Sequence, residues 1–318
     1  MEYLTDMKAI LHSKRANLYA LEKCRVIVKD GRVVFLTETK KDYRYWNIPI
    51  ANTTFILLGI GTSITQAAVR MLSSAGVMIG FTGSGGTPIL SGTEIEFLSP
   101  QSEYRPTEYM QGWMSFWFDD YKRLKAAKIL QHRRLEFLEK VWEKESLFQD
   151  NHFFIDDIEI EKATNSFSKK IDQSTKSIML LQAEALFTKS LYKYSARNTH
   201  QTSFVRNRDD LDSINMFLNH GNYLAYGLAA VSLWTLGIPH GFAVMHGKTR
   251  RGALVFDIAD LIKDAIVLPL AFINGSQHNK EQLFREDCLK YFTKHKVLDF
   301  MFNIIKEIAT FSEWKSQP

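Results

Sequence analysis

The chain has 318 residues, of which 45% are hydrophobic, 24% charged and 13% aromatic, and its formal net charge is +5. So many large apolar residues exclude a disordered chain, and 17 glycines with 7 prolines exclude a collagen-like or low-complexity structure. Two cysteines, Cys24 and Cys288, are too few for a disulfide framework or a four-sulfur zinc site, and the small basic excess permits an anionic partner without identifying one.

The first hundred residues show the alternation of apolar and polar side chains that is typical of β-strands. Asp30 and Gly31 separate two such segments, and because this pair tolerates positive φ angles, we predict a β-hairpin there. A short apolar run rich in β-branched residues predicts a further strand. The predicted strands are residues 17–21, 24–29, 32–37, 53–58 and 77–82.

A helix is predicted directly after the apolar run. The sequence Gly-Ile-Gly at residues 59–61 leads to Thr62 or Ser63 as N-cap, and the helix is expected to reach about residue 75, before Gly76. A Gly-x-Gly between a strand and a helix is also part of the dinucleotide-binding fingerprint. Its third glycine would fall at Ile64, and no series of strand–helix–strand units follows, so the pattern favours a tight turn.

The character of the sequence changes at residues 99–106, a polar stretch bracketed by Pro100 and Pro106. Beyond it, apolar residues recur with the spacing of helices. We therefore predict an α+β protein with a small N-terminal β-rich domain at residues 1–100, a linker at 101–106 and a larger α-helical domain at 107–318. The predicted helices are residues 113–141, 171–194, 211–236, 252–272 and 280–313, the last being two helices.

One helical segment raises the question of a membrane span. No Asp, Glu, Lys or Arg occurs from Ser213 to Gly247, and residues 223–245 within this run are strongly apolar. Gly237 and Pro239 interrupt the run before about 20 unbroken helical residues accumulate, so we predict a buried helix and no membrane association. The N-terminal residues lack the apolar core of a signal peptide, and the low cysteine count leads us to expect a cytoplasmic protein.

Glu184 is the only charged residue between Lys176 and Lys189. Its helical neighbours at three and four residues are mostly apolar, which places a carboxylate on the apolar stripe of a helix. An unpaired buried carboxylate is costly. Glu184 is therefore either a structural residue, at an edge or in a buried ion pair, or a group that meets a cation or a base in a functional cleft.

Asp257 and Asp260 are three residues apart, so their carboxylates share one face of the predicted helix, and Asp264 continues that face. Acids near the N-terminus of a helix also suit the helix dipole, which would be a purely structural role. The functional interpretation is a metal site, because His246 ends the uncharged run eleven residues before Asp257.

Three cations lie in the four positions 248–251, shortly after His246. Carboxylates hold hard divalent ions, one imidazole also suits Mn²⁺, and cations bind phosphates, so the arrangement suits a metal-assisted phosphodiester site with Mg²⁺ or Mn²⁺. Zinc is disfavoured, because the chain has neither an HExxH sequence nor a cysteine cluster. The three cations are Lys248, Arg250 and Arg251.

A second basic stretch, at residues 122–134, contains no acid. On a helix its cations would cover more than half of the circumference. This face is either simply solvated or a stripe that contacts a nucleic-acid backbone. Its members are Lys122, Arg123, Lys125, Lys128, Arg133 and Arg134.

Taken together, these residues resemble a known family, the CRISPR-associated integrase, which is the metal-dependent endonuclease of spacer acquisition. The sequence Val-Phe-Asp-Ile-Ala-Asp-Leu-Ile-Lys at residues 255–263 is similar to the C-terminal motif of that family, and Glu184 matches its first acid. Leu-Leu-Gly-Ile-Gly-Thr-Ser-Ile-Thr at residues 57–65 resembles its N-terminal turn, and Leu-Asn-His-Gly-Asn-Tyr at residues 218–223 resembles its midsection. The similarity covers most of the chain.

The resemblance implies an N-terminal β-domain joined to an α-helical catalytic domain, in a homodimer. It implies that Glu184, His246 and Asp260 ligate Mn²⁺ or Mg²⁺, with Asp257 as an essential catalytic acid beside them. The implied reaction is attack by the 3′-hydroxyl of captured DNA on a phosphodiester at the repeat boundary of a CRISPR array, which serves antiviral defence. The implied phosphate-binding residues are Lys248, Arg250, Arg251 and Lys263.

The implied partners are double-stranded DNA, both as the captured fragment and as the repeat array, and a small second adaptation protein. In the subtype that this chain resembles, that second protein is fused to a helicase-nuclease. Two other functions stay open: a metal-dependent DNA nuclease of another repair or recombination pathway, and a non-catalytic DNA-binding scaffold. A scaffold would depend on the basic stretch at residues 122–134 more than on His246.

Overall fold

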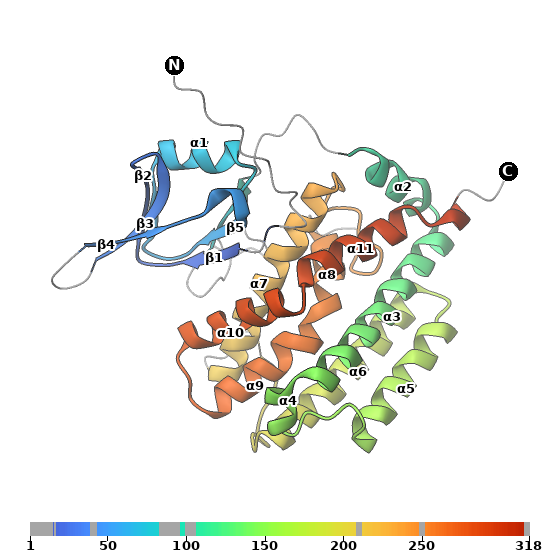
Figure 1. Cartoon of the computed structure of the whole chain (residues 1–318). Coiled ribbons are helices and arrows are strands. Elements are labelled where there is room, and N and C mark those ends of the chain that lie inside the picture. Colours follow the sequence, from blue (N-terminus) through green and yellow to red (C-terminus); the bar gives the residue numbers. More distant parts are fainter. Residues whose placement is uncertain are drawn as a thin grey trace. The chain divides into compact units, whose positions relative to one another are not determined.

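The computed structural model describes Arg15 and residues 17–38, 43–82, 96–98, 106–207, 212–247 and 252–314. The chain divides into two compact units, residues 1–105 and 106–318. Among the described residues, the first unit contains the β-strands and one α-helix, and the second consists of helices (Figure 1). The predicted α+β fold class, with a β-rich N-terminal part followed by a larger helical part, is therefore confirmed.

Two four-stranded sheets form the described part of the first unit. In one sheet β1, β5 and β7 are parallel, and β8 adds an antiparallel edge. In the other, β4, β3 and β2 are antiparallel neighbours, and β6 pairs in parallel with β2. The strands are β1 Asn17–Leu21, β2 Arg25–Lys29, β3 Arg32–Glu38, β4 Tyr43–Asn47, β5 Thr53–Leu58, β6 Ser63–Ile64, β7 Met78–Phe81 and β8 Glu96–Leu98.

The β2–β3 hairpin turns where the sequence predicts. Lys29 pairs with Arg32, and the two residues between them, Asp30 and Gly31, have φ angles of 50° and 70°. Positive φ at both central residues is the geometry of a type I′ turn, which favours Asp-Gly. The sequence does not predict β4, because all of its residues are exposed and it has no apolar face to reveal it.

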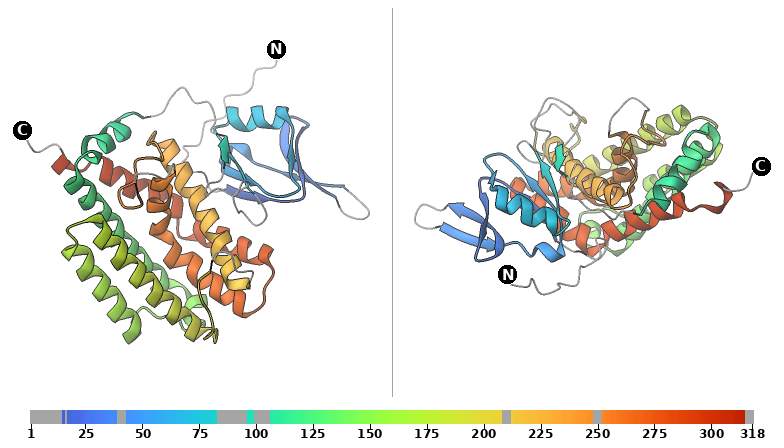
Figure 2. Two further views of the ribbon diagram at one scale, coloured as in Figure 1. Left: turned by 180° about the vertical axis from the view of Figure 1, so that it is seen from behind. Right: turned by 90° about the horizontal axis from the view of Figure 1, so that it is seen from above.

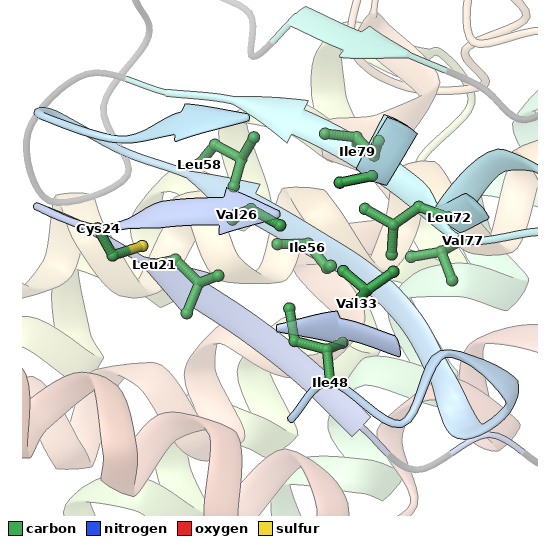
Figure 3. Packing of buried hydrophobic residues seen from close by; sticks show 11 residues of the cluster. Leu21, Cys24, Val26, Val33, Ile48, Ile56, Leu58, Leu72, Val77 and Ile79 are labelled. Atoms are coloured by element: carbon green, nitrogen blue, oxygen red, sulfur yellow. The ribbon is translucent and has the colours of Figure 1, made fainter. Parts of the chain in front are cut away.

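Apolar side chains from both sheets and from helix α1 (Gln66–Ser74) pack into one core (Figure 3). Val26 of β2, Ile56 of β5 and Leu72 of α1 are fully buried in it. Burial of these three elements on one another holds the two sheets together, because apolar area removed from water is the dominant favourable contribution to folding.

Helix α1 begins later than the sequence suggests. Thr65, and not Thr62 or Ser63, is its N-cap, and its hydroxyl accepts the N–H of Ala68 at 3.3 Å. Ser63 is instead taken up by the sheet as part of β6. The preceding Gly-Ile-Gly segment is a tight turn as predicted, with a φ of 69° at Gly61.

The second unit is a helical bundle in which α7 and α8 are buried along most of their length. Helix α7 packs against α8, α9 and α11, and α3 packs against α8. Helices α3, α5 and α6 lie beside one another (Figure 2). The helices are α2 Glu108–Trp117, α3 Asp120–Lys144, α4 Ser146–Asp150, α5 Ile158–Gln173, α6 Ser177–Asn198, α7 Ser213–Thr235, α8 Ala253–Ile262, α9 Leu268–Ser276, α10 Glu281–Lys294 and α11 Val297–Ala309.

Three helix predictions need correction. The stretch predicted as one helix at residues 113–141 is two helices, because Asp119 interrupts it and caps α3 by accepting the N–H groups of Tyr121 and Lys122. The predicted helix at 171–194 joins the end of α5 to α6, which Ser174 separates. The predicted helix at 252–272 contains a π-helical turn, Lys263–Val267, and reaches Ser276.

The apolar segment at residues 223–245 contributes its first part to α7, which ends at Thr235. In the described part of the chain, no helix is both long enough and apolar enough to cross a membrane. The long uncharged run therefore builds a buried helix of the bundle, as its interruption by Gly237 and Pro239 predicts.

Candidate active site

Asp257 of α8 holds the segment that ends in His246. One carboxylate oxygen, Oδ2, accepts the N–H groups of Val244 and Met245 at 2.7 and 3.1 Å, and Oδ1 accepts the N–H of His246 at 2.9 Å. Asp257 is only 1% exposed. Since a buried carboxylate must be compensated, these three backbone donors explain how the charge is tolerated.

The ring of His246 is fixed by the same carboxylate. Its Nδ1 lies 2.7 Å from Oδ1 of Asp257, and since a carboxylate only accepts, Nδ1 carries a proton. The other ring nitrogen, Nε2, lies 3.7 Å from Oδ2 of Asp260. Burial lowers the pKa of His246, but the hydrogen bond to Asp257 and the charge of Asp260 outweigh it, so the pKa lies above the ordinary histidine value.

Asp260 lies one helical turn after Asp257 and is 2% exposed. Its Oδ1 forms an ion pair with the ammonium of Lys263. Burial raises the pKa of Asp260, but the positive charges of Lys263, His246 and Arg134 outweigh burial and leave the pKa below its ordinary value. Asp260 is therefore a charged, buried carboxylate between an imidazole and an ammonium.

Glu184 of α6 pairs with Arg134 of α3, with Nη1 of the arginine 3.1 Å from Oε1 of the glutamate. The same guanidinium donates from Nε to Oδ2 of Asp264 at 2.7 Å and from Nη2 to the hydroxyl of Thr188 at 3.1 Å. Arg134 is 2% exposed. Of the alternatives that the sequence leaves open for Glu184, the structure contains the structural one, an ion pair with a buried arginine, although Glu184 also lines a pocket.

A pocket opens beside these groups. Its charged lining residues are Glu184, Arg134, Lys263 and Asp264. Glu184 and Lys263 are partly exposed beside this pocket, whereas Arg134 and Asp264 are buried. The remaining lining residues are Thr188, Tyr192, Leu218, Asn222, Val267 and Leu268.

The three predicted metal ligands are brought into one region but not into one coordination sphere. His246 and Asp260 are neighbours, whereas Glu184 is bound to Arg134. Within the described ranges, no group of three or more His, Cys, Asp or Glu side chains is arranged to hold a metal ion. The donor types nevertheless fit Mg²⁺ or Mn²⁺, and the buried carboxylate of Asp260 has no other cation than Lys263 in direct contact with Oδ1 among the described residues.

Lys263 belongs to this site through Asp260, and its side chain is 21% exposed. Its ammonium also lies 5.5 Å from the centre of the Tyr226 ring. The other three predicted phosphate-binding residues, Lys248, Arg250 and Arg251, lie outside the described residues.

The basic stretch of α3 is not one continuous surface. Arg134 points into the site, and Arg123 is buried and ion-paired with Asp120. Arg133 pairs with Glu136 and Glu307 at 2.7 and 2.6 Å. The sequence places Arg134 with its neighbours on a solvated or DNA-binding face, and this is wrong for Arg134, because acids of α6 and of the π-helical turn bind it inside the bundle.

The fold and the site define a class: a β-rich unit followed by a helical unit whose buried helix carries two aspartates beside a histidine. Residues 18–298 match the family model of CRISPR associated protein Cas1. The chain is 50% identical over 311 residues to the CRISPR-associated endonuclease Cas1 of Pseudomonas aeruginosa, which covers 96% of each chain. The chain therefore belongs to the Cas1 family.

Solved structures of low sequence identity share the fold. A CAS1 protein from Thermotoga maritima superposes with a TM-score of 0.71 at 15% identity, over 93% of this chain and 97% of that one. A casposase bound to its integration product superposes with a TM-score of 0.70 at 12% identity, over 93% of this chain and 92% of the casposase.

Proposed function

We propose that this chain is a metal-dependent DNA endonuclease and integrase that inserts short foreign DNA fragments into a CRISPR array. The observation that carries the proposal is the arrangement of His246 between Asp257 and Asp260, in a chain of the Cas1 family. A buried acid–imidazole pair beside a second, charged acid is a donor set that suits phosphodiester chemistry with a hard divalent ion.

Glu184, His246 and Asp260 would hold Mn²⁺ or Mg²⁺. The bound ion would supply a Lewis acid, which activates a hydroxyl and neutralises charge on the phosphate oxygens. The cation Arg134 now balances Glu184, and Lys263 balances Asp260. Both acids are already paired with a positively charged side chain. A bound divalent ion would therefore replace these side chains as the positive charge that neutralises the two acids.

The residues of the chain have separate tasks in this proposal. Asp257 fixes the backbone and the ring of His246, so that Nε2 is the nitrogen directed toward Asp260. Lys263, together with Lys248, Arg250 and Arg251, would bind phosphate oxygens. The 3′-oxygen of the captured DNA forms a new bond to phosphorus at the repeat boundary, and the bond to the old 3′-oxygen breaks, releasing a 3′-hydroxyl.

The partners in this proposal are double-stranded DNA, as fragment and as repeat array, a second copy of the chain and a second adaptation protein. In the proposed subtype the latter is fused to a helicase-nuclease. The 50% identity to a CRISPR-associated endonuclease over nearly the whole chain supports an adaptation role over a role in another repair pathway. The likeness of the fold to a casposase with its integration product is in keeping with joining and not only hydrolysis.

The test is strand transfer of a labelled short duplex into a supercoiled plasmid with a repeat array, in the presence of Mn²⁺. Mutation of a residue that only orients a metal ligand lowers metal affinity or activity about 10- to 100-fold. Asp260 is proposed as a direct ligand, so Asp260→Ala is expected to lower the rate of strand transfer at least about 100-fold. It should also weaken Mn²⁺ binding measured by electron paramagnetic resonance, whereas Asp150→Ala, at an exposed site, should change neither.

Each alternative gives a different result. Cleavage without covalent joining of the duplex would favour a nuclease of another pathway. Full strand transfer by Asp260→Ala would refute the metal assignment. If both Asp260→Ala and His246→Ala keep every activity while removal of Lys122 and Lys125 abolishes DNA binding, the chain is a scaffold.

A further inference from the structure

The segment that carries His246 is held from two sides. Asp257 binds the N–H groups of residues 244–246, as described above. In the two residues before this stretch, Phe242 and Ala243, the carbonyl oxygens are bound. The indole N–H of Trp113 donates to the carbonyl oxygen of Phe242 at 3.0 Å, and the indole N–H of Trp117 donates to that of Ala243 at 2.7 Å. Consecutive peptide groups from 242 to 246 therefore have side-chain partners.

The two indoles come from one helix. Trp113 and Trp117 are four residues apart on α2, so they lie on the same face, one turn from each other. Trp117 also packs edge-on against Phe242, with ring centroids 4.9 Å apart. The two donors on α2 thus reach two neighbouring carbonyl groups.

Helix α2 is itself well anchored. Gly112 lies so close to α11 that a Cβ there would come 2.0 Å from the carbonyl oxygen of Ala309. Trp113 is fully buried. Arg123 of α3 donates from Nη1 to Trp117 O at 2.9 Å, and its guanidinium lies 5.6 Å from the centre of the Trp117 ring. These contacts make α2 a rigid support for the segment.

We infer that Trp113 and Trp117 are positioning residues, which set the place of the His246 imidazole by binding the carbonyl groups that precede it. Segments without regular structure are mobile unless their backbone groups are bound. A displacement of about 1 Å in a catalytic group can cost about 100-fold in rate. The expected effect on the catalytic rate rests on the proposed function, whereas the fixation of the backbone at residues 242–246 does not depend on it.

The decisive variant is Trp117→Phe, which keeps an aromatic side chain but removes the N–H donor together with part of the ring volume. Trp117 is half-buried, so the substitution leaves a smaller defect than Trp113→Phe would. The matched control is Trp314→Phe, because Trp314 also donates to a backbone carbonyl, that of Ile308 at 2.6 Å, and this bond does not touch the segment.

The first measurement is hydrogen exchange of the amides of residues 244–246 in the metal-free protein. Loss of one neutral hydrogen bond predicts exchange about fivefold faster in Trp117→Phe, with a further increase in the Trp113→Phe and Trp117→Phe double variant. Trp314→Phe should exchange at the wild-type rate. The second measurement is strand transfer, in which we expect kcat to fall about fivefold with KM for DNA unchanged.

Unchanged exchange in Trp117→Phe, or equal acceleration in Trp314→Phe, would overturn the inference whatever the activity. Faster exchange together with full activity of His246→Ala would support the positioning of the segment and contradict the proposed function. A fall in kcat without faster exchange would show that Trp117 acts by another route.

Discussion

The two acid clusters of the helical unit are stabilised in different ways. Asp257 is bound by three backbone N–H groups and an imidazole, so its charge is spread over fixed dipoles. Glu184 and Asp264 share one guanidinium, that of Arg134. The first arrangement holds its geometry whatever ion is present, whereas the second is a balance of charge that another cation can replace.

The largest effect should come from breaking the first cluster. Asp257→Ala leaves three backbone N–H groups without their acceptor, two of them in buried hydrogen bonds, and each buried unsatisfied group costs about 1–3 kcal/mol. We expect the free energy of unfolding to fall by about 3 kcal/mol or more, measured by urea denaturation in the presence of a chelator. Asp257→Asn keeps one acceptor oxygen and should recover part of the loss. Equal stability of Asp257→Ala and the exposed-site variant Asp150→Ala would contradict the comparison.

A smaller loss, about 2 kcal/mol near neutral pH, is expected for Arg134→Met, because Glu184 is partly open to the pocket and reaches water. Burial raises the pKa of Asp264, opposed by Arg134, and the pKa stays above its ordinary value. Without Arg134 that pKa rises further. When the pKa of an acid is higher in the folded than in the unfolded protein, the acid destabilises the fold fully at pH values above its folded pKa. This destabilisation is absent at pH values below its unfolded pKa.

The deficit of Arg134→Met should therefore shrink as the pH falls, since a protonated Asp264 needs no cation. Urea unfolding at a series of pH values between about 4 and 7 checks this. A matched loss for Lys128→Met, whose ammonium binds the carbonyl of Asp172 on the exposed side of α3, would show that the effect is not specific to the buried acids. A deficit that grows toward acid pH would contradict the charge-balance explanation.

The sequence predicts the first cluster better than the second, for a physical reason. Asp257 and Asp260 are placed on one face by helical spacing alone, and the nearby His246 is reached by a short connection. Arg134 meets partners 50 and 130 residues away, and no local period reports such a pairing. Its position in a run of cations predicts a solvated face, although only some of that run is exposed.

The same distinction applies to the fold. Elements whose own residues carry a turn or a cap signal are predictable, as Asp30 and Gly31 of the β2–β3 hairpin illustrate. Edge strand β4 has no buried face, and α5 begins among acids that obscure its apolar side, so neither is predicted. The π-helical turn after α8 depends on tertiary packing around Asp264 and has no sequence signal of its own.

The smallest effect distinguishes two histidines that both face acids. The pKa of His246 is raised, because Asp257 and Asp260 outweigh burial. The pKa of His295, whose Nε2 lies 2.6 Å from Oε1 of Glu145, is lowered, because burial outweighs Glu145. A base with a raised folded pKa stabilises the protein fully below its unfolded pKa of about 6.5, and this contribution is lost as the pH rises through the folded value.

Measured without metal, the stability that wild type has over His246→Gln should therefore be greater at about pH 5.5 than at about pH 9. For His295→Gln the slope should be opposite, because protonation of His295 is disfavoured in the folded state. We expect each difference to stay below about 1 kcal/mol, since the side chain of His246 is 26% exposed and partly screened by water. If the stability difference changed with pH in the same direction for both variants, His246 would not be held as a charged partner of Asp257. The contrast between the two acid clusters would then depend only on the result for Arg134→Met.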